Sequence, residues 1–279
     1  MRADETPGKE SVMTQTMWKK SIAITGAGSG FGAALAHHYA AEGFNVAVTD
    51  IDEDRARRTC YEIQEMDGES FSMKLDITRP EDWMQLYAAV LERWGGLQML
   101  VNNAGVAVAG NVEETSMEDW SWVLDIDLMG VVRGCHQFAG LMKRQKAGHF
   151  VNIASFAGLA GLPSIAAYGV AKAGVVALSE ALRAEMLPYG VGVTVACPAF
   201  VKTGLLDSFR SSKPGTHAKV AHWMETSGIS AEQVAEEIAM AVRKNKFLLL
   251  THAETRKAWR IKRWFPQYYF KMLTNSIRG

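Results

Sequence analysis

The sequence predicts an α/β fold in a single domain: a doubly wound, mainly parallel sheet between two layers of helices, in a three-layer αβα arrangement. Short apolar segments alternate with amphipathic segments over residues 18–251, as expected for the strands and helices of such a sheet. A glycine-rich turn joins the first strand to the first helix. Polar residues directly follow several strands, which is where open parallel sheets bind their ligands.

The composition permits a large core and argues against several classes of protein. Of the 279 residues, 48% are hydrophobic and 22% are charged, so broad disorder is not expected. Lys+Arg and Asp+Glu both number 30, so no overall charge favours a nucleic-acid partner. The three cysteines, Cys60, Cys135 and Cys197, are too scattered for a disulfide framework or a zinc site, which predicts a reducing, cytoplasmic setting. The histidines form no metal-binding motif, and no metal is expected.

The two ends of the chain differ from the region between them. Residues 1–17 are polar and contain Pro7 and Gly8, so they are expected to form a disordered leader. Residues 252–279 form a C-terminal extension that mixes basic and aromatic side chains, which is typical of a surface for a membrane or another anionic partner. The alternative is a helix packed on the domain or on a neighbouring subunit, and Pro266 favours it by interrupting any single amphipathic face.

The first strand, residues 21–25, runs directly into the glycine-rich turn, and a helix over 33–42 follows. Glycine lets a phosphate approach the backbone, and a helix N-terminus offers free N–H groups to a pyrophosphate. No Gly-Lys-Ser/Thr follows the turn, so a P-loop nucleotidase is disfavoured. The cofactor-binding residues expected here are Gly26, Gly28, Ser29, Gly30, Phe31 and Gly32.

The second strand, residues 45–49, ends at Asp50, which stands 24 residues after Gly26. A carboxylate at this distance is placed to accept hydrogen bonds from the ribose hydroxyls of an adenosine. Its charge would repel the 2′-phosphate of NADP, and the nearest cation is Arg55, so NAD is the expected cofactor. The alternative is that Asp50 only caps the helix that begins near Glu53.

The alternation of strands and helices continues to residue 250. Pro80 opens one helix, Ser116 is the expected cap of a long one, and Pro188 with Gly190 ends another. Helices are expected over 54–66, 80–94, 116–144, 164–187 and 231–245, and strands over 70–75, 97–101, 150–154, 191–196 and 247–250. Residues 204–228 lack a clear periodicity, and so long a loop is expected to form a lid over a substrate.

The sequence Tyr168-Gly169-Val170-Ala171-Lys172 places a phenol and an ammonium one helical turn apart. A neighbouring ammonium lowers the pKa of a tyrosine from its ordinary value of about 10, so that the phenol can exchange a proton with an alcohol or a carbonyl. Ser155 follows the strand 150–154, and its hydroxyl could hold the substrate oxygen within reach of the phenol. Taken alone, the tyrosine and lysine have a simpler interpretation as a chance pair on a helix surface.

Together these motifs resemble those of the short-chain dehydrogenase/reductase family over about residues 19–250. The motifs are Thr25 to Gly32, Asn102-Asn103-Ala104-Gly105, Ser155, Tyr168 with Lys172, and Pro198 to Thr203. The resemblance implies a Rossmann-type fold and hydride transfer with NAD(P). It also implies that Tyr168 is the general acid/base and that Ser155 holds the substrate oxygen. In the same way, Lys172 is implied to bind the nicotinamide ribose and to lower the pKa of Tyr168.

The resemblance assigns further residues to the cofactor. Asn103 corresponds to a residue that stabilises the sheet, Asp76 to one near the adenine, and Thr203 to one that binds the nicotinamide carboxamide. The other positions expected beside the cofactor are Ile77, Ala104, Gly105, Pro198, Ala199 and Val201. A homodimer or homotetramer is also implied, because the helices over 116–144 and 164–187 resemble the pair on which subunits of the family pack.

Two positions depart from the family's pattern. Asp127 stands where members usually carry an asparagine that supports a water between the lysine and bulk solvent. Asp127 is still expected to take part in catalysis through its backbone carbonyl, and its charge could pair with Lys172. Ala199 stands where the family often has glycine, beside the nicotinamide.

The expected function is that of an NAD(H)-dependent oxidoreductase that interconverts a hydrophobic secondary alcohol and its ketone. The hydrophobic substrate is inferred from the apolar residues of the lid, which are Leu205, Leu206, Phe209, Val220, Trp223 and Met224. Two alternatives stay open. One is a non-catalytic, NAD-binding sensor or scaffold. The other is a lipid or retinoid dehydrogenase that works at a membrane surface through residues 252–279.

Overall fold

The computed structural model describes residues 19–201, 204–211 and 213–278. At its centre is a seven-stranded sheet in the order β3-β2-β1-β4-β6-β7-β9, in which every neighbouring pair of strands is parallel. The strands are β1 (Ser21–Thr25), β2 (Asn45–Asp50), β3 (Ser70–Lys74), β4 (Met99–Asn102), β6 (Gly148–Ile153), β7 (Val191–Ala196) and β9 (Leu248–Leu249). The sheet grows outward from β1 in both directions, and the predicted doubly wound topology is confirmed.

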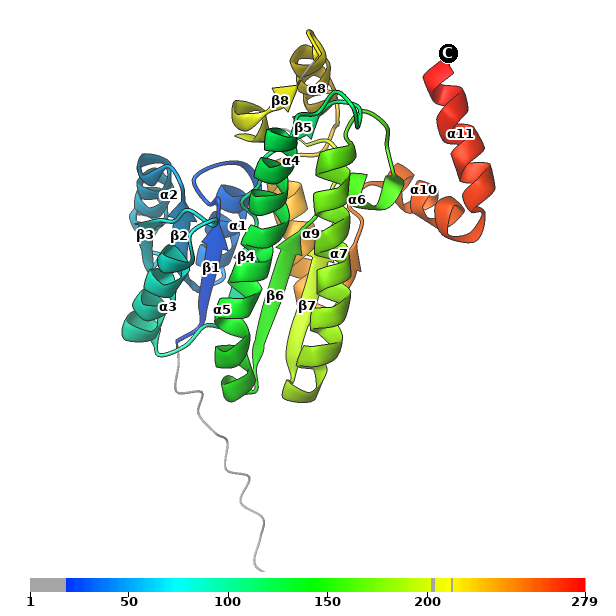
Figure 1. Cartoon of the computed structure of the whole chain (residues 1–279). Coiled ribbons are helices and arrows are strands. Elements are labelled where there is room, and N and C mark those ends of the chain that lie inside the picture. The colour runs from blue at the N-terminus through cyan, green and yellow to red at the C-terminus, as the bar shows by residue number, and fades with distance from the viewer. Residues whose placement is uncertain (1–18, 202–203, 212, 279) are drawn as a thin grey trace, which may run out of the picture.

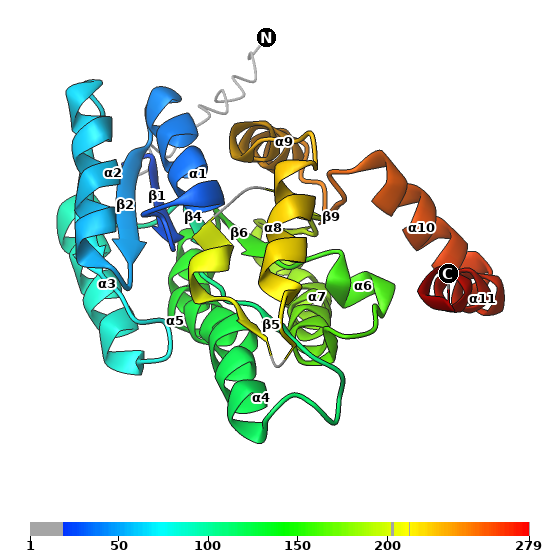
Figure 2. The same cartoon turned by 90° about the horizontal axis from the view of Figure 1, so that it is seen from above.

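Helices cover both faces of this sheet, as Figures 1 and 2 show from two directions. One face carries α1 (Gly30–Ala41), α2 (Glu53–Glu65) and α9 (Ala231–Arg243), and the other carries α3 (Pro80–Trp94), α5 (Gly130–Gln145) and α7 (Ala166–Met186). Each face has its own apolar core, which gives the predicted three layers.

The central strands are apolar along their whole length because helices cover both of their sides. Leu100 and Phe150 pack toward α3, α5 and α7, whereas their chain neighbours Val101 and Val151 pack toward α1, α2 and α9. All four side chains are fully buried. Successive side chains of a strand point to opposite faces of the sheet, so each strand contributes to both cores. This explains why the sequence shows apolar runs here and no alternation of apolar and polar residues.

The long helix expected over 116–144 is interrupted by a π-helical turn. It consists of α4 (Met117–Leu124), the π turn η1 (Asp125–Met129) and α5. Ser116 caps α4 as predicted, since its hydroxyl accepts a hydrogen bond from the Asp119 N–H at 3.0 Å. The prediction of one regular helix was wrong at the π turn. Here the Asp127 side chain accepts the Val106 N–H at 2.7 Å, a bond to a distant loop that local periodicity does not encode.

Several short elements were not expected. They are α6 (Ala157–Ala160), the turn η2 (Leu187–Tyr189), and a small parallel pair of β5 (Val108–Ala109) with β8 (Arg210–Ser211). The predicted lid contains the turn η3 (Gly204–Ser208) and α8 (Thr216–Glu225) among its described residues. Elements of two to five residues are too short for a periodic pattern, so the sequence offers no signal for them.

The C-terminal extension forms two helices, α10 (Ala253–Trp264) and α11 (Pro266–Arg278). Figures 1 and 2 show α10 leaving the edge of the body near α6, and α11 turning away from it. Pro266 is the first residue of α11, a position that proline tolerates, so it separates two helices at this point. In the part of the chain described here, no helix has both the length and the apolar character needed to cross a bilayer.

Candidate active site

A cavity lies beyond the carboxyl ends of β1, β2, β4 and β6, the edge where open parallel sheets bind ligands. Most of the predicted site residues line it: Gly26, Ser29, Gly30, Phe31, Asp50, Asp76, Ile77, Asn103, Ala104, Gly105, Ser155, Tyr168, Lys172, Pro198, Ala199 and Val201. Gly28, Gly32 and Asp127 are not among the lining residues. Thr203 lies outside the described residues. The chain thus brings together residues that are far apart in sequence.

The glycine turn leaves the N-terminus of α1 open toward this cavity. Gly26 has a φ of +63°, a conformation that glycine adopts at little cost. The N-cap residue Ser29 makes no side-chain capping bond, and the first turn of α1 carries no acidic residue. Both Ser29 and Gly30 line the cavity. An uncapped helix N-terminus beside a cavity is suited to an anion such as a pyrophosphate.

Gly28 and Gly32 allow close approaches between the glycine turn and its neighbours, although neither lines the cavity. A Cβ on Gly32 would lie 2.2 Å from the Gly26 carbonyl oxygen, so only glycine allows α1 to approach the turn this closely. A Cβ on Gly28 would lie 2.5 Å from the Arg55 Cβ. Both glycines therefore shape the backbone that faces the cavity without lining it themselves.

Thr25 and Asn103 hold the turn after β1 against the turn after β4. The Thr25 hydroxyl accepts the N–H groups of Asn103 and Ala104 at 2.9 and 3.0 Å. The Asn103 side-chain amide donates to the Thr25 carbonyl at 2.8 Å. These bonds are structural and join the two loops that form the floor of the cavity.

Asp50 extends from the end of β2 into the same cavity. Its carboxylate accepts the Gly28 N–H at 2.9 Å and the Asp52 N–H at 3.0 Å. The alternative that Asp50 caps α2 is wrong, because the cap is Asp52, which accepts the N–H groups of Asp54 and Arg55. A carboxylate has room for about four hydrogen bonds, so Asp50 retains acceptor capacity for sugar hydroxyls.

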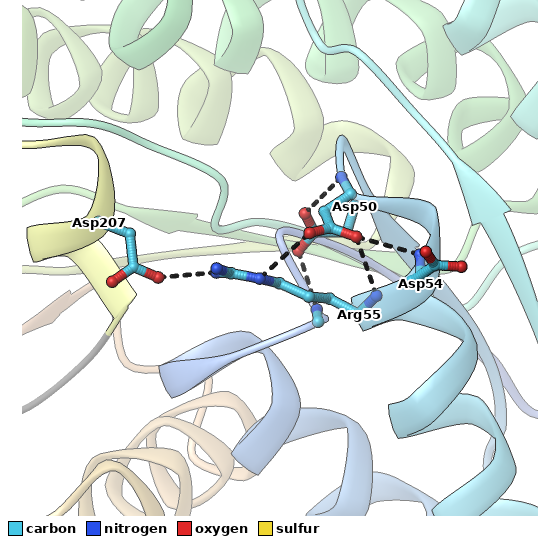
Figure 3. Close-up of polar contacts among 6 residues, drawn as sticks. Asp50, Asp54, Arg55 and Asp207 are labelled. Carbon is cyan, nitrogen blue, oxygen red and sulfur yellow. Dashed lines mark hydrogen bonds and ion pairs between the residues drawn. The ribbon is translucent and has the colours of Figure 1, made fainter.

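Arg55 and Asp207 also line the cavity, and Figure 3 shows the contact between their side chains. The Arg55 Nη1 atom lies 2.9 Å from Asp207 Oδ2, and its Nε lies 3.3 Å from Asp52 Oδ2. Asp207 belongs to η3, so this ion pair connects the predicted lid to α2. No sequence motif pointed to Asp207, because the pair joins residues that are distant along the chain.

Ser155 and Tyr168 meet on the other side of the cavity. Ser155 lies just after β6, and its hydroxyl oxygen accepts the Ala157 N–H at 3.2 Å. Tyr168 lies in the first turn of α7 and lines the same cavity as Ser155, which is among the groups that lower its pKa. The alternative that Tyr168 and Lys172 are a chance surface pair is wrong, because both line the cavity and Lys172 is only 4% exposed.

Lys172 is held by two other parts of the chain. Its Nζ donates to the Ile153 carbonyl at 3.2 Å and lies 3.1 Å from Asp127 Oδ2. Asp127 is fully buried in the π turn, and its other oxygen accepts the Val106 N–H. The ion pair suggested by the sequence therefore forms, and it fixes the ammonium between β6 and η1.

Burial and charge act in opposite directions on these groups. Burial is the largest effect on Tyr168 and raises its pKa; Lys172 lowers it, Asp127 raises it, and the net pKa lies above the ordinary 10.0. Burial is the largest single effect on Lys172 and lowers its pKa, but Asp127, Tyr168 and Cys197 together raise it, and the net pKa lies above the ordinary 10.5. The lysine thus acts on the phenol in the expected direction, but the net depression expected from the sequence is absent because burial and Asp127 oppose it.

The lid contributes apolar side chains to the open side of the cavity. Of the lid residues singled out in the sequence, Leu205 and Met224 line it, together with Val106 and Ile126 from the loop after β4 and from η1. Phe200 and Trp223 pack ring against ring, with centroids 5.3 Å apart, and so connect the loop after β7 to α8. Among the described residues, no group of three or more histidine, cysteine or acidic side chains forms a metal-like cluster.

Comparisons with known proteins agree with this geometry. A family model described as short chain dehydrogenase matches residues 20–214. The chain is 33% identical over 255 residues to a protein of Mycobacterium tuberculosis named probable oxidoreductase EphD, covering 88% of this chain but only 43% of that protein. It is 32% identical over 205 residues to a cyclohexanol dehydrogenase of Acinetobacter, covering 73% of this chain and 82% of the relative.

A solved structure resembles the whole α/β body. It is a short chain dehydrogenase/reductase from Burkholderia phymatum in complex with NAD, with 32% identity and a TM-score of 0.82. The match covers 89% of this chain and 94% of that one.

Proposed function

Since the chain belongs to the short-chain dehydrogenase/reductase family of oxidoreductases, we propose that it interconverts a hydrophobic secondary alcohol and its ketone with NAD(H), using Tyr168 as the general acid/base. The observation that carries the proposal is the convergence of Ser155, Tyr168 and Lys172 on one cavity with the open N-terminus of α1. Binding a nucleotide would not require an acid/base tyrosine. A buried lysine behind that tyrosine favours an enzyme over a sensor.

The side chains have complementary roles in the proposed reaction. NAD supplies the hydride acceptor and, in its oxidised form, a positive charge. Tyr168 removes the hydroxyl proton of the alcohol, or returns it to the ketone in reverse. Ser155 donates a hydrogen bond to the substrate oxygen and holds it within reach of the phenol. Lys172, held by Ile153 and Asp127, stabilises the phenolate form by its charge.

The residues of the cavity fit NAD. The open N-terminus of α1 would hold the pyrophosphate, and Asp50 would accept the ribose hydroxyls of the adenosine. Asp76 and Ile77 line the same end of the cavity and would flank the adenine. A preference for NAD over NADP rests on two features: the charge of Asp50 and the engagement of Arg55 by Asp207.

A hydrophobic alcohol is supported by the apolar side chains on the open side of the cavity. A relative is named a cyclohexanol dehydrogenase, and cyclohexanol is a secondary alcohol of low polarity.

We propose a cytoplasmic setting, which is supported by the free, buried state of all three cysteines. A homodimer or homotetramer is supported by exposed apolar residues along α4, η1 and α7, which include Met117, Met129 and Val170.

Turnover of a panel of secondary alcohols with NAD⁺, followed by the fluorescence of NADH, tests the proposal. We expect Tyr168→Phe to lower turnover by about 100- to 10,000-fold while NADH binding stays within twofold of the wild type. Tyr61→Phe, at an exposed position on α2, is the matched control and should leave both unchanged. NADH binding without turnover of any alcohol, in the wild type and the variant alike, would favour the sensor instead.

A further inference from the structure

The helices α10 and α11 present a large apolar surface that the rest of the described chain leaves uncovered. Trp264, Phe265, Tyr268 and Phe270 are 73%, 65%, 59% and 62% exposed. They lie within seven residues of one another at the junction of the two helices, so their exposed side chains are concentrated in one short stretch. Single exposed apolar residues are ordinary on protein surfaces, but a cluster of four aromatic side chains indicates a contact with something else.

The same two helices concentrate positive charge. The whole chain is neutral, but residues 252–278 contain seven basic residues, Arg256, Lys257, Arg260, Lys262, Arg263, Lys271 and Arg278, and one acidic residue, Glu254. Among the side chains described over residues 253–275, no basic group lies within ion-pair distance of a carboxylate, although Arg256 lowers the pKa of Glu237 by its charge. Lys257, Arg260, Arg263 and Lys271 are exposed. An anionic partner would therefore neutralise charge that the protein itself leaves uncompensated.

The inner side of α10 is fixed to the body. Trp259 packs on the core beside α7, and the Lys262 ammonium donates to the Leu159 carbonyl in α6. α6 begins two residues after Ser155, which lines the cavity, so the anchored helix lies near that wall. Figure 1 shows α11 rising from α10 toward the end of the molecule that carries the lid.

We propose that α10 and α11 form a docking surface for an anionic lipid bilayer. Aromatic side chains prefer the boundary between headgroups and acyl chains, and lysine and arginine bind the lipid phosphates beside them. A second copy of this chain fits the surface less well, because a symmetric contact would place the same positive patch against itself. The proposal does not depend on the reaction proposed above.

The position of the docking surface gives it a use. The lid and α11 point to the same end of the molecule, and α6 connects the cavity wall to α10. A bilayer held by α10 and α11 would thus lie beside the open, apolar side of the cavity. Apolar alcohols partition into membranes, so docking would bring the enzyme to its substrate.

Co-sedimentation of the full chain with lipid vesicles tests this proposal. One vesicle preparation contains phosphatidylcholine with phosphatidylglycerol, and the other contains phosphatidylcholine alone. We expect at least tenfold more protein to sediment with the anionic vesicles than with the neutral ones. Added salt should release the bound protein from the anionic vesicles, because it screens the attraction between basic side chains and lipid phosphates. A wild-type chain that stays in the supernatant with both vesicles would overturn the proposal.

Two sets of variants with matched controls locate the surface. Trp264→Ser with Phe265→Ser should reduce vesicle binding at least tenfold, whereas Tyr61→Ser with Met84→Ser, at equally exposed positions on α2 and α3, should not. Lys257→Gln, Arg260→Gln and Arg263→Gln together should remove the preference for anionic vesicles. Gln at Arg58, Lys244 and Lys246, which are exposed on the body, is the charge control.

Sedimentation velocity of the same variants distinguishes a membrane surface from a subunit interface. We expect the oligomeric state to be unchanged by Trp264→Ser with Phe265→Ser, and circular dichroism to show an unchanged fold. If these substitutions dissociate an oligomer and leave vesicle binding intact, the surface is an interface between copies and the proposal is wrong. Equal loss of vesicle binding in the control variants would also overturn it.

Discussion

At the scale of single residues, the buried pair of Asp127 and Lys172 sets the electrostatics of the candidate site. Lys172 lowers the pKa of Tyr168, whereas Asp127 and Cys197 raise it. Burial raises the pKa of Asp127 itself, but its ion pair with Lys172 favours the charged carboxylate. Asparagine could accept the Val106 N–H in the same way, but it would not carry that charge. The aspartate therefore makes the phenol harder to ionise than an asparagine would.

We predict that Asp127→Asn moves the pH dependence of alcohol oxidation to lower pH. Oxidation requires the phenolate, and Asp127 raises the pKa of Tyr168, so removing its charge lowers that pKa. The measurement is the turnover rate against pH for wild type and variant. Asp125→Asn, two residues away in a half-buried pair with Arg133, is the control and should leave the profile in place. A shift to higher pH would contradict the electrostatic account.

A second residue-scale prediction concerns stability in acid. His149 is buried in β6, where its Nε2 atom lies 2.8 Å from the Thr194 hydroxyl, and burial lowers its pKa from 6.5 to about 4. The unfolded chain therefore binds a proton below pH 6.5 that the folded chain binds only near pH 4. The contribution of His149 to the free energy of unfolding is therefore fully present above pH 6.5. It is lost as the pH falls toward 4, by roughly 3 kcal/mol at most.

We expect His149→Gln to flatten this loss, as measured by urea unfolding at pH 7 and pH 4.5. His217→Gln, on the exposed surface of the lid, should keep the wild-type dependence. Parallel loss of stability in wild type and His149→Gln would assign the acid sensitivity to other groups.

At the scale of elements, the contact between η3 and α2 connects the lid to the cofactor end of the cavity. Asp207 forms an ion pair with the guanidinium of Arg55, and Arg55 is the cation nearest Asp50 along the chain. Arg55 is thereby kept from acting as a receptor for a 2′-phosphate.

We predict that Asp207→Asn weakens the discrimination against NADPH by roughly three- to fivefold, the range expected when one partly exposed ion pair is lost. Fluorescence titration with NADH and NADPH measures it. Asp54→Asn is a suitable control, because Asp54 lies beside Arg55 in Figure 3 but pairs with Arg57 on the outside of α2. NADH and NADPH affinities that change in equal proportion would show that Asp207 has no role in the choice.

A second element-scale prediction concerns the approach of α5 to β4. A Cβ on Gly134 would lie 2.2 Å from the Asn102 side-chain oxygen and 2.6 Å from Trp83, so no side chain fits there. Gly134→Ala should lower the free energy of unfolding by about 1–3 kcal/mol. In Gly140→Ala, in the same helix, the new methyl group meets only the end of the flexible Arg144 side chain, so stability should be unchanged or up to about 1 kcal/mol higher. Urea unfolding of both variants measures the difference.

At the scale of the whole molecule, the order and the type of the main elements could be predicted from the sequence. Each main strand is an apolar run bounded by turn residues, and helices such as α2 and α9 have one apolar stripe and clear caps. The candidate site was predictable because its residues stand at strand ends, and a parallel sheet brings all strand ends to one edge.

What the sequence could not predict depends on contacts between distant residues. The π turn at Asp127, the β5–β8 pair and the Arg55–Asp207 ion pair each join segments that local patterns treat independently. The net pKa of Tyr168 was missed for the same reason, since it depends on how deeply α7 is buried and on a carboxylate from another helix. The spacing of Tyr168 and Lys172 along one helix predicted that the two side chains are close, but it could not predict the burial of Tyr168 or the nearby carboxylate of Asp127.

The small β5–β8 pair has a consequence for how such a protein diversifies. It fastens the middle of the lid, directly after η3, to the loop after β4, so α8 starts from a segment that is held in place. The glycine turn, Asp50 and the loop after β4 all come from the first half of the chain, while the lid comes from the second. Residues 213–228 follow this fastened segment, so a graft there would alter the lid and leave the glycine turn, Asp50 and the loop after β4 in place.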